Sequence, residues 1–569
     1  MPKDKIKVKN KNLPDEVKKE LDELAQQLPK VETVEEILET LKKQHPKKYK
    51  DDPGTYEKIA QAMHEQQERI LKNSSKLALD KPQSMAELAE RLRAEGDWWR
   101  DANTKITEDG NIKVPRMPPR TIADILKKYL ITAVIGDSDK EVDRSLIYFY
   151  NIDTGIYSAL TRPIEKLCLA VDRRAGMRER KEAIEYIRLE SPRKSLNTDS
   201  HLIVCNNGIF NKNTGKIEPF SPNYFFTAKI ATDYNPDAKE PIYNGWRPSE
   251  WFKQLSDNDK AKYTLIWQLI ASACNGNFLQ PYAFFLVDDG IGRTGKGTFQ
   301  EMLMAVVGPG NFASLRLKEF ESEFKLASAV GVSLIIGDDN NPNDYHEENS
   351  NFKSMVTGDI ILVNPKGLPP YTAKSHALIV QSMNGLPKLK DTTGGNLRRF
   401  IVIKFNHQYE DTPEGRRIKD DYIKRKEFRE WLLKEAVKVD IEHLAITDES
   451  KSAVEKLKTE NDPVAFFMET YFPELKSERI PTAFLFKLYQ ATNKFETGQI
   501  GNMTQRTFTK KVIKLLPEGW SYSKKDMYVG EHWNGEDNQT LKKYNPSIAY
   551  EYDNAKRDNY ARQGLIYRK

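Results

Sequence analysis

The sequence predicts a multidomain protein with an α-helical N-terminal region, an α/β P-loop ATPase core and a C-terminal winged-helix-like domain. Three patterns predict this organisation. A glycine loop joins a short apolar strand, 282–287, to a helix that ends at Val307. Two later apolar strands end in polar side chains, and a basic helix–turn–helix pattern covers 479–525. With 569 residues, the chain should form roughly three to four domains.

Shifts in composition give the domain boundaries. The N-terminal region is charged, with apolar residues at helical spacing in Val17–Leu28, Val34–Leu41 and Ile59–Leu71. We expect a helical bundle there, and a structural role is favoured over contact with DNA. The predicted domains are a helical domain at 1–115, a mixed α/β domain at 116–245, the ATPase core at 246–450 and the winged-helix-like domain at 451–569.

Overall composition narrows the compartment but not the partner. Lys and Arg number 89 against 83 Asp and Glu, so the mean charge is only mildly basic. No apolar run is long enough to span a bilayer and the first residues are charged, so we expect a cytoplasmic protein with no membrane partner. The cysteines Cys168, Cys205 and Cys274 lie far apart in apolar contexts, which is typical of small core residues and not of zinc ligands.

The glycine loop has the spacing of a phosphate-binding loop: Gly290, four residues, then Gly295 and Lys296. Glycines let backbone N–H groups turn inward around a triphosphate, and the following helix N-terminus adds partial positive charge. Lys296 would reach the β- and γ-phosphates of ATP. The predicted nucleotide-binding residues are Gly290, Gly292, Arg293, Thr294, Gly295, Lys296, Gly297 and Thr298. A glycine turn without a ligand is the alternative.

Magnesium should be held beside this loop. Position 297 is Gly, where a hydroxyl is expected, so Thr298 must supply the hydroxyl ligand. The apolar strand 332–337 ends in Asp338 and Asp339. At the carboxyl end of a parallel strand, Asp338 can hold Mg²⁺ through water while Asp339 orients and deprotonates the attacking water. A surface turn is the alternative for this pair.

A third apolar strand, 376–383, ends in Asn384. Its amide can position the lytic water without adding charge. Two arginines, Arg398 and Arg399, precede the next strand, 401–405. One of them can reach the nucleotide of a neighbouring subunit and stabilise charge on the transferred phosphoryl group, which implies a ring. We assign this role to Arg398 and a structural salt bridge to the other, although the sequence leaves the choice open.

Between these strands, 352–372 is predicted as a hairpin with Lys366 at its tip. A lysine there suits contact with a DNA phosphate backbone, because a point charge needs no base register. An ordinary solvated lysine is the alternative.

The C-terminal region has the pattern of a DNA-binding helix–turn–helix. In the helix 504–516, Phe508, Val512 and Leu515 would face inward. The strand 522–528 could form a wing. Residues 451–569 hold 20 Lys and Arg against 15 acidic residues, as an electrostatic footprint on DNA requires. The predicted DNA contacts are Arg506, Lys510, Lys511 and Lys514. A solvated basic helix is the alternative.

Taken in order, the glycine loop, Asp338-Asp339, the hairpin 352–372, Asn384 and Arg398-Arg399 resemble superfamily 3 AAA+ DNA helicases. The branch is the one shared by phage and plasmid primase-helicases and poxvirus replicative helicases. The 204–238 stretch resembles the domain that precedes the helicase in that branch, and the layout is similar to replication initiator helicases (Rep) of staphylococcal pathogenicity islands. The resemblance covers about 200–405 strongly.

This resemblance implies a homo-hexamer that hydrolyses ATP between subunits and unwinds DNA 3′ to 5′, with single-stranded DNA in its channel and host replication proteins as further partners. Gly297 and the shorter Asp339, where many relatives have Ser or Thr and Glu, depart from the family pattern. Since 1–115 shows helices and no carboxylate cluster, primase activity is not expected. The alternatives are an origin-binding protein whose ATPase controls only assembly, and a P-loop kinase of small molecules.

Overall fold

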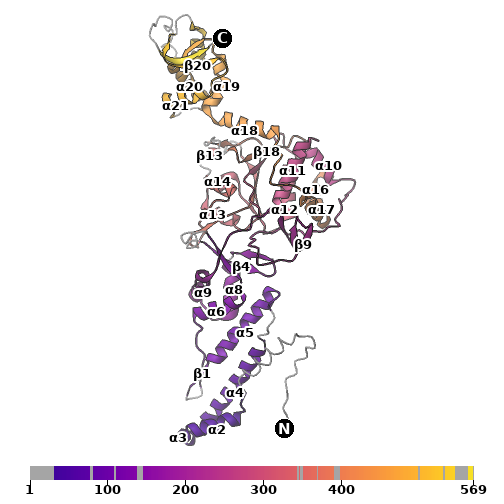
Figure 1. Ribbon diagram of the computed structural model, residues 1–569, viewed down its shortest axis with the longest axis vertical. Coiled ribbons are helices and arrows are strands. Elements are labelled where there is room, and N and C mark those ends of the chain that lie inside the picture. The colour runs from indigo at the N-terminus through magenta and orange to yellow at the C-terminus, as the bar shows by residue number, and fades with distance from the viewer. Residues whose placement is uncertain are drawn as a thin grey trace. The chain divides into compact units, whose positions relative to one another are not determined.

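The computed structural model describes most of the chain, in two compact units (Figure 1). The described residues are 31–76, 81–107, 111–136, 145–159, 161–341, 345–346, 350–367, 369–389, 397–497, 500, 502–528, 532–544 and 562–567. The first unit lies within Met1–Thr198, Lys216–Lys229 and Pro370–Ala373, and the second within Asp199–Gly215, Ile230–Pro369 and Lys374–Lys569. The helix predicted at Val17–Leu28 lies outside the described residues.

The first unit is mainly helical, with a four-stranded sheet in the order β5-β4-β3-β6 and the two-stranded sheet β1-β2. Its helices are α2 (Val34–Gln44), α3 (Pro46–Asp51), α4 (Pro53–Lys76), α5 (Met85–Asn103), α6 (Pro119–Tyr129), α8 (Thr161–Val171) and α9 (Met177–Glu190). Its strands are β1 (Lys105–Ile106), β2 (Ile112–Lys113), β3 (Thr132–Ile135), β4 (Ile147–Asn151), β5 (Ile156–Ser158), β6 (Arg193–Lys194), β9 (Lys216–Glu218) and β15 (Tyr371–Ala373).

Helix α2 begins where the sequence has a capping box. The Thr33 hydroxyl accepts from the Glu36 N–H at 3.2 Å, and the Glu36 carboxylate accepts from the Thr33 N–H at 2.8 Å. These two bonds satisfy N–H groups that a helix end would otherwise leave open. Helices α2 and α4 cover the helices predicted at Val34–Leu41 and Ile59–Leu71, so both predictions are confirmed.

The helix before the predicted boundary at residue 115 shares its core with the residues after it. Leu88 and Leu92 of α5 are buried in one cluster with Leu126 of α6 and Cys168 of α8. Gly96 permits this packing, because a Cβ there would lie 1.9 Å from the Val171 carbonyl oxygen. The packing thus continues across the boundary that composition suggests.

The second unit is built on a five-stranded parallel sheet in the order β11-β12-β16-β10-β18. The strands are β11 (Phe312–Ser314), β12 (Leu334–Asn340), β16 (Leu378–Met383), β10 (Ala283–Val287) and β18 (Phe400–Lys404). Strand β10 is a continuous apolar run, and β12 and β16 each begin with three apolar residues, as expected when helices cover both faces of a parallel sheet. The strands predicted around the glycine loop, Asp338 and Asn384 are confirmed.

Helices and short strands complete this unit. The helices are α10 (Pro248–Leu255), α11 (Lys260–Ala273), α12 (Lys296–Val307), α13 (Glu323–Leu326), α14 (Ser350–Thr357), α16 (Pro413–Asp420), α17 (Lys426–Ala436) and α18 (Asp448–Asn461). The short strands are β7 (Leu202–Cys205), β8 (Gly208–Asn211), β13 (Tyr345–His346), β14 (Ile361–Val363) and β17 (Lys388–Leu389). Residues 350–357 form a helix, so the predicted hairpin begins later, at β14.

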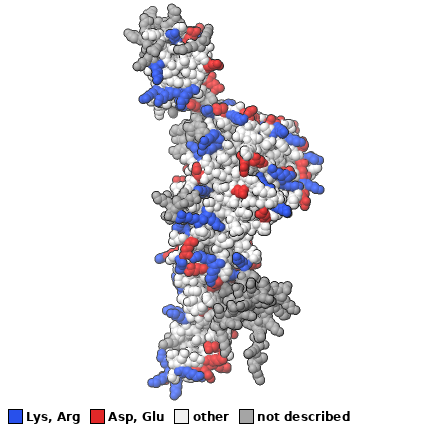
Figure 2. Space-filling view, viewed as in Figure 1, with Lys and Arg blue, Asp and Glu red and all other residues white. Residues whose placement is uncertain are grey.

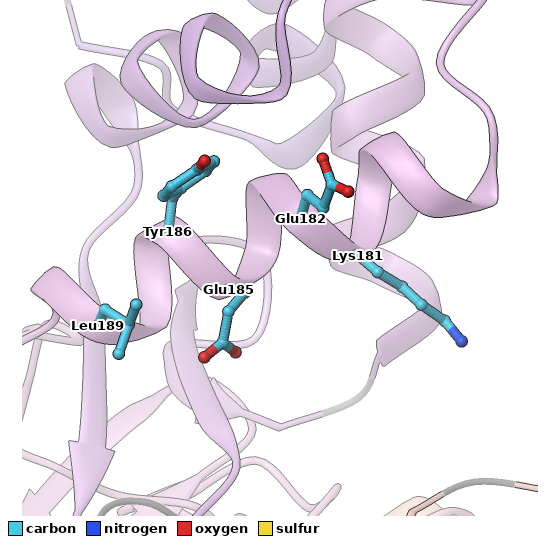
Figure 3. Close-up of a pocket in the computed structure, with 5 residues that line it drawn as sticks. All are labelled: Lys181, Glu182, Glu185, Tyr186 and Leu189. Atoms are coloured by element: carbon cyan, nitrogen blue, oxygen red, sulfur yellow. The ribbon is translucent and has the colours of Figure 1, made fainter.

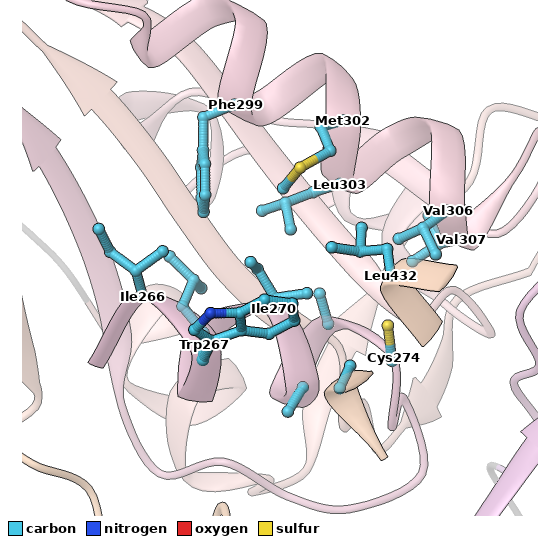
Figure 4. Close-up of a cluster of buried hydrophobic side chains, with 14 of the residues drawn as sticks. Ile266, Trp267, Ile270, Cys274, Phe299, Met302, Leu303, Val306, Val307 and Leu432 are labelled. Atoms are coloured by element: carbon cyan, nitrogen blue, oxygen red, sulfur yellow. The ribbon is translucent and has the colours of Figure 1, made fainter. Parts of the chain in front are cut away.

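The core of the unit holds the helix after the glycine loop in place. Figure 4 shows Phe299, Met302 and Leu303 of α12 directed toward Ile270 and Trp267 of α11. Fully burying each such side chain contributes about 1.5–3 kcal/mol. The strands β7 and β8 join the same cluster through Ile203, Cys205 and Phe210, so this part of the predicted 116–245 domain packs with the ATPase core. All three cysteines are buried thiols.

The C-terminal region alternates helices and strands around its own apolar cluster. Its elements are α19 (Pro463–Thr470), β19 (Arg479–Pro481), α20 (Thr482–Thr497), α21 (Gln505–Lys514), β20 (Trp520–Met527), α22 (Glu536–Tyr544) and β21 (Arg562–Tyr567). The strands form an antiparallel sheet in the order β19-β21-β20. Phe508 and Val512 of α21 are buried as predicted, whereas Leu515 lies just past the helix end and is 38% exposed, so that prediction was wrong.

Candidate active site

The sheet order brings most of the predicted catalytic residues to one edge, with Arg398 as the exception. Strand β16 lies between β10 and β12, and all three run parallel. The glycine loop, Asn384 and Asp338 therefore lie at the carboxyl ends of neighbouring strands. From β10 the chain crosses to β11, β12 and β16 on one side of this strand, and later to β18 on its other side. Ligands of open α/β sheets bind at such a switch point.

The glycine loop folds into a concave turn lined by backbone N–H groups. Its glycines adopt left-handed conformations, with φ of 84° at Gly290, 70° at Gly292 and 85° at Gly295. Two non-glycine residues, Asp289 and Arg293, share this region with φ of 50° and 51°. Left-handed conformations cost such residues roughly 1–2 kcal/mol, so the surrounding contacts must hold the loop. Turns of this kind bind anions.

The last residue of β18 and the segment after this strand supply these contacts. Lys404 Nζ lies 2.7 Å from Asp289 Oδ2. The Tyr409 N–H donates to the Arg293 carbonyl at 3.0 Å, and Gln408 Nε2 donates to the Ile291 carbonyl at 3.2 Å. These three contacts hold Asp289, Ile291 and Arg293 of the loop in place.

Lys296, the first residue of α12, is largely buried and uses all three protons of its ammonium group. It pairs with Asp288 Oδ1 at 2.7 Å. It also donates to the Met383 carbonyl at 2.9 Å and to Asn384 Oδ1 at 2.8 Å. Because an ammonium has three donors, these contacts saturate it. The structure thus joins the predicted Lys296 and Asn384.

Asp288, which the sequence analysis did not select, faces the inside of the glycine loop. Its carboxylate accepts from the N–H of Gly290 at 3.2 Å, from that of Gly292 at 3.1 Å and from the Thr294 hydroxyl at 3.3 Å. Burial acts to raise the pKa of this carboxyl. The hydrogen bond and charge of Lys296, with the two backbone N–H groups, outweigh burial and hold the pKa below its usual value.

The carboxylates on β12 are exposed, whereas the four residues before them are buried. Asp338 Oδ1 accepts from the Ser382 hydroxyl at 2.7 Å and from the Asp339 N–H at 3.0 Å. Asp339 has a φ of 51°, within a register shift between Gly337 and Asn340. This irregularity lets both carboxylates stand at the strand end.

A network of buried side-chain amides stabilises this end of β12. Asn340 donates to Gln381 Oε1 at 3.0 Å and accepts from the Leu317 N–H at 2.8 Å. Gln300 of α12 donates to the Gly337 carbonyl at 3.2 Å. Since each removed partner would leave a buried polar group unsatisfied, the network fixes β12 against α12.

The predicted hydroxyl ligand, Thr298, is half-buried in the first turn of α12. At Gly297, a Cβ would meet open space except for Lys419 Nζ of α16, 3.9 Å away. The absence of a side chain at position 297 therefore leaves room beside the loop.

Arg398 and Arg399 lie at the opposite edge of the sheet. They immediately precede β18, and the Ala283 N–H at the start of β10 donates to the Arg399 carbonyl at 2.8 Å. Strands of this length separate the two edges by roughly 13–17 Å. Arg398 is exposed and Arg399 is half-buried. Neither side chain therefore belongs to the cluster around Lys296.

The predicted DNA-contacting residues come from other elements of the chain. Lys366 is exposed in a turn between β14 and β15. On α21, Arg506, Lys510 and Lys514 are exposed, and Figure 2 shows Lys and Arg side chains gathered over this helix. Lys511 differs, because it is half-buried and its Nζ lies 3.0 Å from Asp462 Oδ2. Asp462 also caps α19, so Lys511 has a structural contact.

A surface hollow lies elsewhere, on α9 of the first unit. Figure 3 shows its lining residues, which all come from this one helix: Lys181, Glu182, Glu185, Tyr186 and Leu189. None of the residues predicted from the sequence lines it. In the described part of the chain, no helix has the length and apolar character needed to cross a bilayer.

Three family models match parts of the chain. A family of unknown function (DUF5906) matches 289–399, a family described as D5 N terminal like matches 123–252, and one described as Poxvirus D5 protein-like matches 459–561. The poxvirus part of the resemblance drawn from the sequence is thus supported at 459–561, and the D5-like match at 123–252 precedes the glycine loop.

Solved structures of the NrS-1 C-terminal region are similar at low levels. One apo structure, described as the A form, has 12% identity and a TM-score of 0.39, and the match covers 79% of this chain and all 100% of that one. Another apo structure has 13% identity and a TM-score of 0.38, with 72% and 97% covered. At these values the likeness assigns no function.

Proposed function

We propose that this chain is an ATP-hydrolysing DNA helicase that initiates replication of a mobile genetic element. Six copies form a superfamily 3 AAA+ ring in the cytoplasm, unwind duplex DNA 3′ to 5′ and bind origin DNA through the C-terminal domain. The observation that carries the proposal is the meeting of Lys296, Asn384 and the Ser382–Asp338 pair at one edge of the sheet. The D5-like matches support a replication-related role of the primase-helicase type.

The residues at this edge fit ATP and Mg²⁺. The concave loop and Lys296 suit the β- and γ-phosphates. Asp338 uses Oδ1 for Ser382, which leaves Oδ2 for a metal ion or its water, and Thr298 would add a hydroxyl. When bound, Mg²⁺ would neutralise charge on the phosphates. Asp339 would take a proton from the attacking water, and Asn384 would orient that water.

Arg398 would act on a neighbouring copy. Because it lies at the far edge of its own sheet, it cannot serve its own loop, but a head-to-tail ring brings that edge toward the next subunit's nucleotide. A cation there stabilises charge on the transferred phosphoryl group. Hydrolysis at such a seam would move the turn that carries Lys366 and with it the bound strand.

The C-terminal region supports binding to duplex DNA. Its order of helix, strand, two helices, strand, helix and strand, with β21 between β19 and β20 in the sheet, suits a winged helix with α21 as the recognition helix. Arg506, Lys510 and Lys514 would contact DNA from its exposed face. This basic face also favours a second function, an origin-binding protein whose ATPase controls assembly without processive unwinding.

A strand-displacement assay separates these two functions. Wild type should release the labelled strand of a forked duplex with ATP, and the 3′-tailed substrate should be preferred. The Lys366→Ala variant should bind ATP normally and fail to unwind. Lys424, an exposed lysine that pairs with Glu301, provides the control substitution, and its alanine variant should unwind. An ATPase-active protein that releases no strand from any substrate would instead support the second function.

A further inference from the structure

The carboxylate of Asp288 lies where a phosphate-binding loop directs its donors. Its two oxygens take the N–H groups of Gly290 and Gly292, the Thr294 hydroxyl and one proton of Lys296. Asp288 is only 2% exposed, so these contacts are shielded from water. Backbone N–H groups in a left-handed turn, a lysine and a helix N-terminus together form an anion site, and the anion here belongs to the chain itself.

Lys296 cannot serve a polyphosphate while it keeps all of its contacts. Its three protons go to Asp288, the Met383 carbonyl and Asn384. A phosphate oxygen needs at least one of them. The bond to Asp288 is the one whose loss is compensated by the ligand, because a phosphate brings more negative charge to the same donors. The same exchange applies to the N–H groups of Gly290 and Gly292.

We propose that Asp288 determines the affinity of the nucleotide site, because its carboxylate fills the phosphate position of the loop and a nucleoside triphosphate must displace it. The inference rests on the proposed nucleotide binding at this loop. Its physical consequence is a competition: the apparent affinity falls by the fraction of molecules in which the carboxylate occupies the loop. In the absence of ligand, the bound carboxylate also stabilises the conformation of the loop, in which Asp289 and Arg293 are strained.

The test compares two neighbouring carboxylates. Asp288→Asn keeps an oxygen that can accept from the Gly290 and Gly292 N–H groups and removes the charge. Asp289→Asn is the matched control, since Asp289 pairs with Lys404 and makes no bond to the loop donors among the contacts described. Binding of a fluorescent ATP analogue and of inorganic tripolyphosphate would be measured for the full chain and both variants.

Asp288→Asn should bind both probes about tenfold more tightly than wild type, as expected if the carboxylate occupies about nine tenths of free molecules. Asp289→Asn should stay within about twofold of wild type, because it leaves that occupancy unchanged. Asp288→Ser, which cannot reach Lys296, provides a second variant and should also bind more tightly. Without ligand, both Asp288 variants should melt at lower temperature than wild type, since the loop loses its internal anion.

Two results would overturn the proposal. If Asp288→Asn and Asp288→Ser bind the probes as wild type does or more weakly, Asp288 serves only to orient Lys296. If Asp289→Asn tightens binding equally, general charge and not loop occupancy is responsible. Failure of the underlying function looks different, because then wild type and every variant, including Lys296→Ala, would fail to bind either probe.

Discussion

The Ser382 hydroxyl donates to Asp338 Oδ1 at 2.7 Å, while the carbonyl of the next residue, Met383, accepts from Lys296. Two consecutive residues of the central strand β16 therefore join the glycine loop to the carboxylate strand. A shift of one register position would turn the Ser382 hydroxyl to the other face and break its contact with Asp338, since side chains alternate between the faces of a strand.

Ser382→Ala should slow hydrolysis without weakening nucleotide binding. Loss of one hydrogen bond to a carboxylate costs about 1.5–3 kcal/mol, so kcat should fall roughly tenfold to a hundredfold. The KM for ATP should change less than about threefold, because the loop donors are untouched. Steady-state ATPase measurements with DNA present test this expectation.

Ser382→Thr is the control for that experiment. It restores the hydroxyl and should recover most of the rate. Equal losses in Ser382→Thr and Ser382→Ala would show that packing on the buried strand, and not the bond to Asp338, carries the effect.

Arg398→Ala should abolish hydrolysis while the variant still binds ATP. The arginine lies at the sheet edge opposite Lys296, so its loss should remove charge stabilisation only at the seam with a neighbour. Arginine fingers contribute about 10³–10⁵ in kcat. Mixing Arg398→Ala with the equally inactive Lys296→Ala should recover activity, to about a quarter of the wild-type rate if subunits mix at random.

The matched control is a mixture of Arg398→Ala with the double variant Lys296→Ala/Arg398→Ala. That mixture contains no seam with both residues and should stay inactive. Recovery in it, or none in the first mixture, would contradict the assignment in trans. The corresponding Arg399→Ala mixtures test the other arginine.

Lys510→Ala and Lys511→Ala, although adjacent, should behave differently. Lys510 is exposed, whereas Lys511 pairs with Asp462 at 3.0 Å. Removal of a phosphate contact lowers the slope of log affinity against log salt by about 0.9, which is expected for Lys510→Ala with duplex DNA. Lys511→Ala should leave the slope unchanged and lower the melting temperature of the C-terminal region. Titrations at several salt concentrations measure the slopes, and equal slopes for Lys510→Ala and wild type would refute the α21 interface.

The sequence predicts the parts of this site that depend on local pattern. An apolar run followed by Gly290 to Lys296, and later runs ending in Asp338 and Asn384, are signals that need no knowledge of tertiary structure. Their meeting follows from the rule that carboxyl ends of parallel strands share an edge.

The residues that the sequence did not reveal depend on tertiary geometry. Asp288 reaches the loop only because the chain turns back through left-handed residues after it, and the visible signal was a charged residue directly after a buried strand. Ser382 meets Asp338 only through the register of β16 on β12, which is shifted between Gly337 and Asn340. In sequence it is one small polar residue in an apolar run, and many strands contain one.

Acid should destabilise the second unit through His376, which lies just before β16. Burial, aided by Lys374, lowers the pKa of His376, although its hydrogen bond to the Asn277 carbonyl at 3.0 Å opposes this. As the pH falls below about 6.5, His376 therefore becomes protonated in the unfolded chain while it stays neutral in the folded protein. The contribution to stability is therefore full above pH 6.5 and falls as the pH drops from there to the folded pKa.

The His376→Asn variant tests this dependence, since an amide can keep the donor to Asn277 but does not titrate. Between pH 7.5 and 5.5 the melting temperature of the wild type should fall more than that of His376→Asn. His443→Asn is the control for replacing a histidine by asparagine, because the side chain of His443 is 85% exposed. Because Asn384 directly follows β16, the loss of nucleotide binding in acid should follow the same curve. If the melting temperatures of wild type and His376→Asn fell equally with pH, the acid sensitivity would belong to other groups. Carboxyl groups lose their contribution to stability only at lower pH.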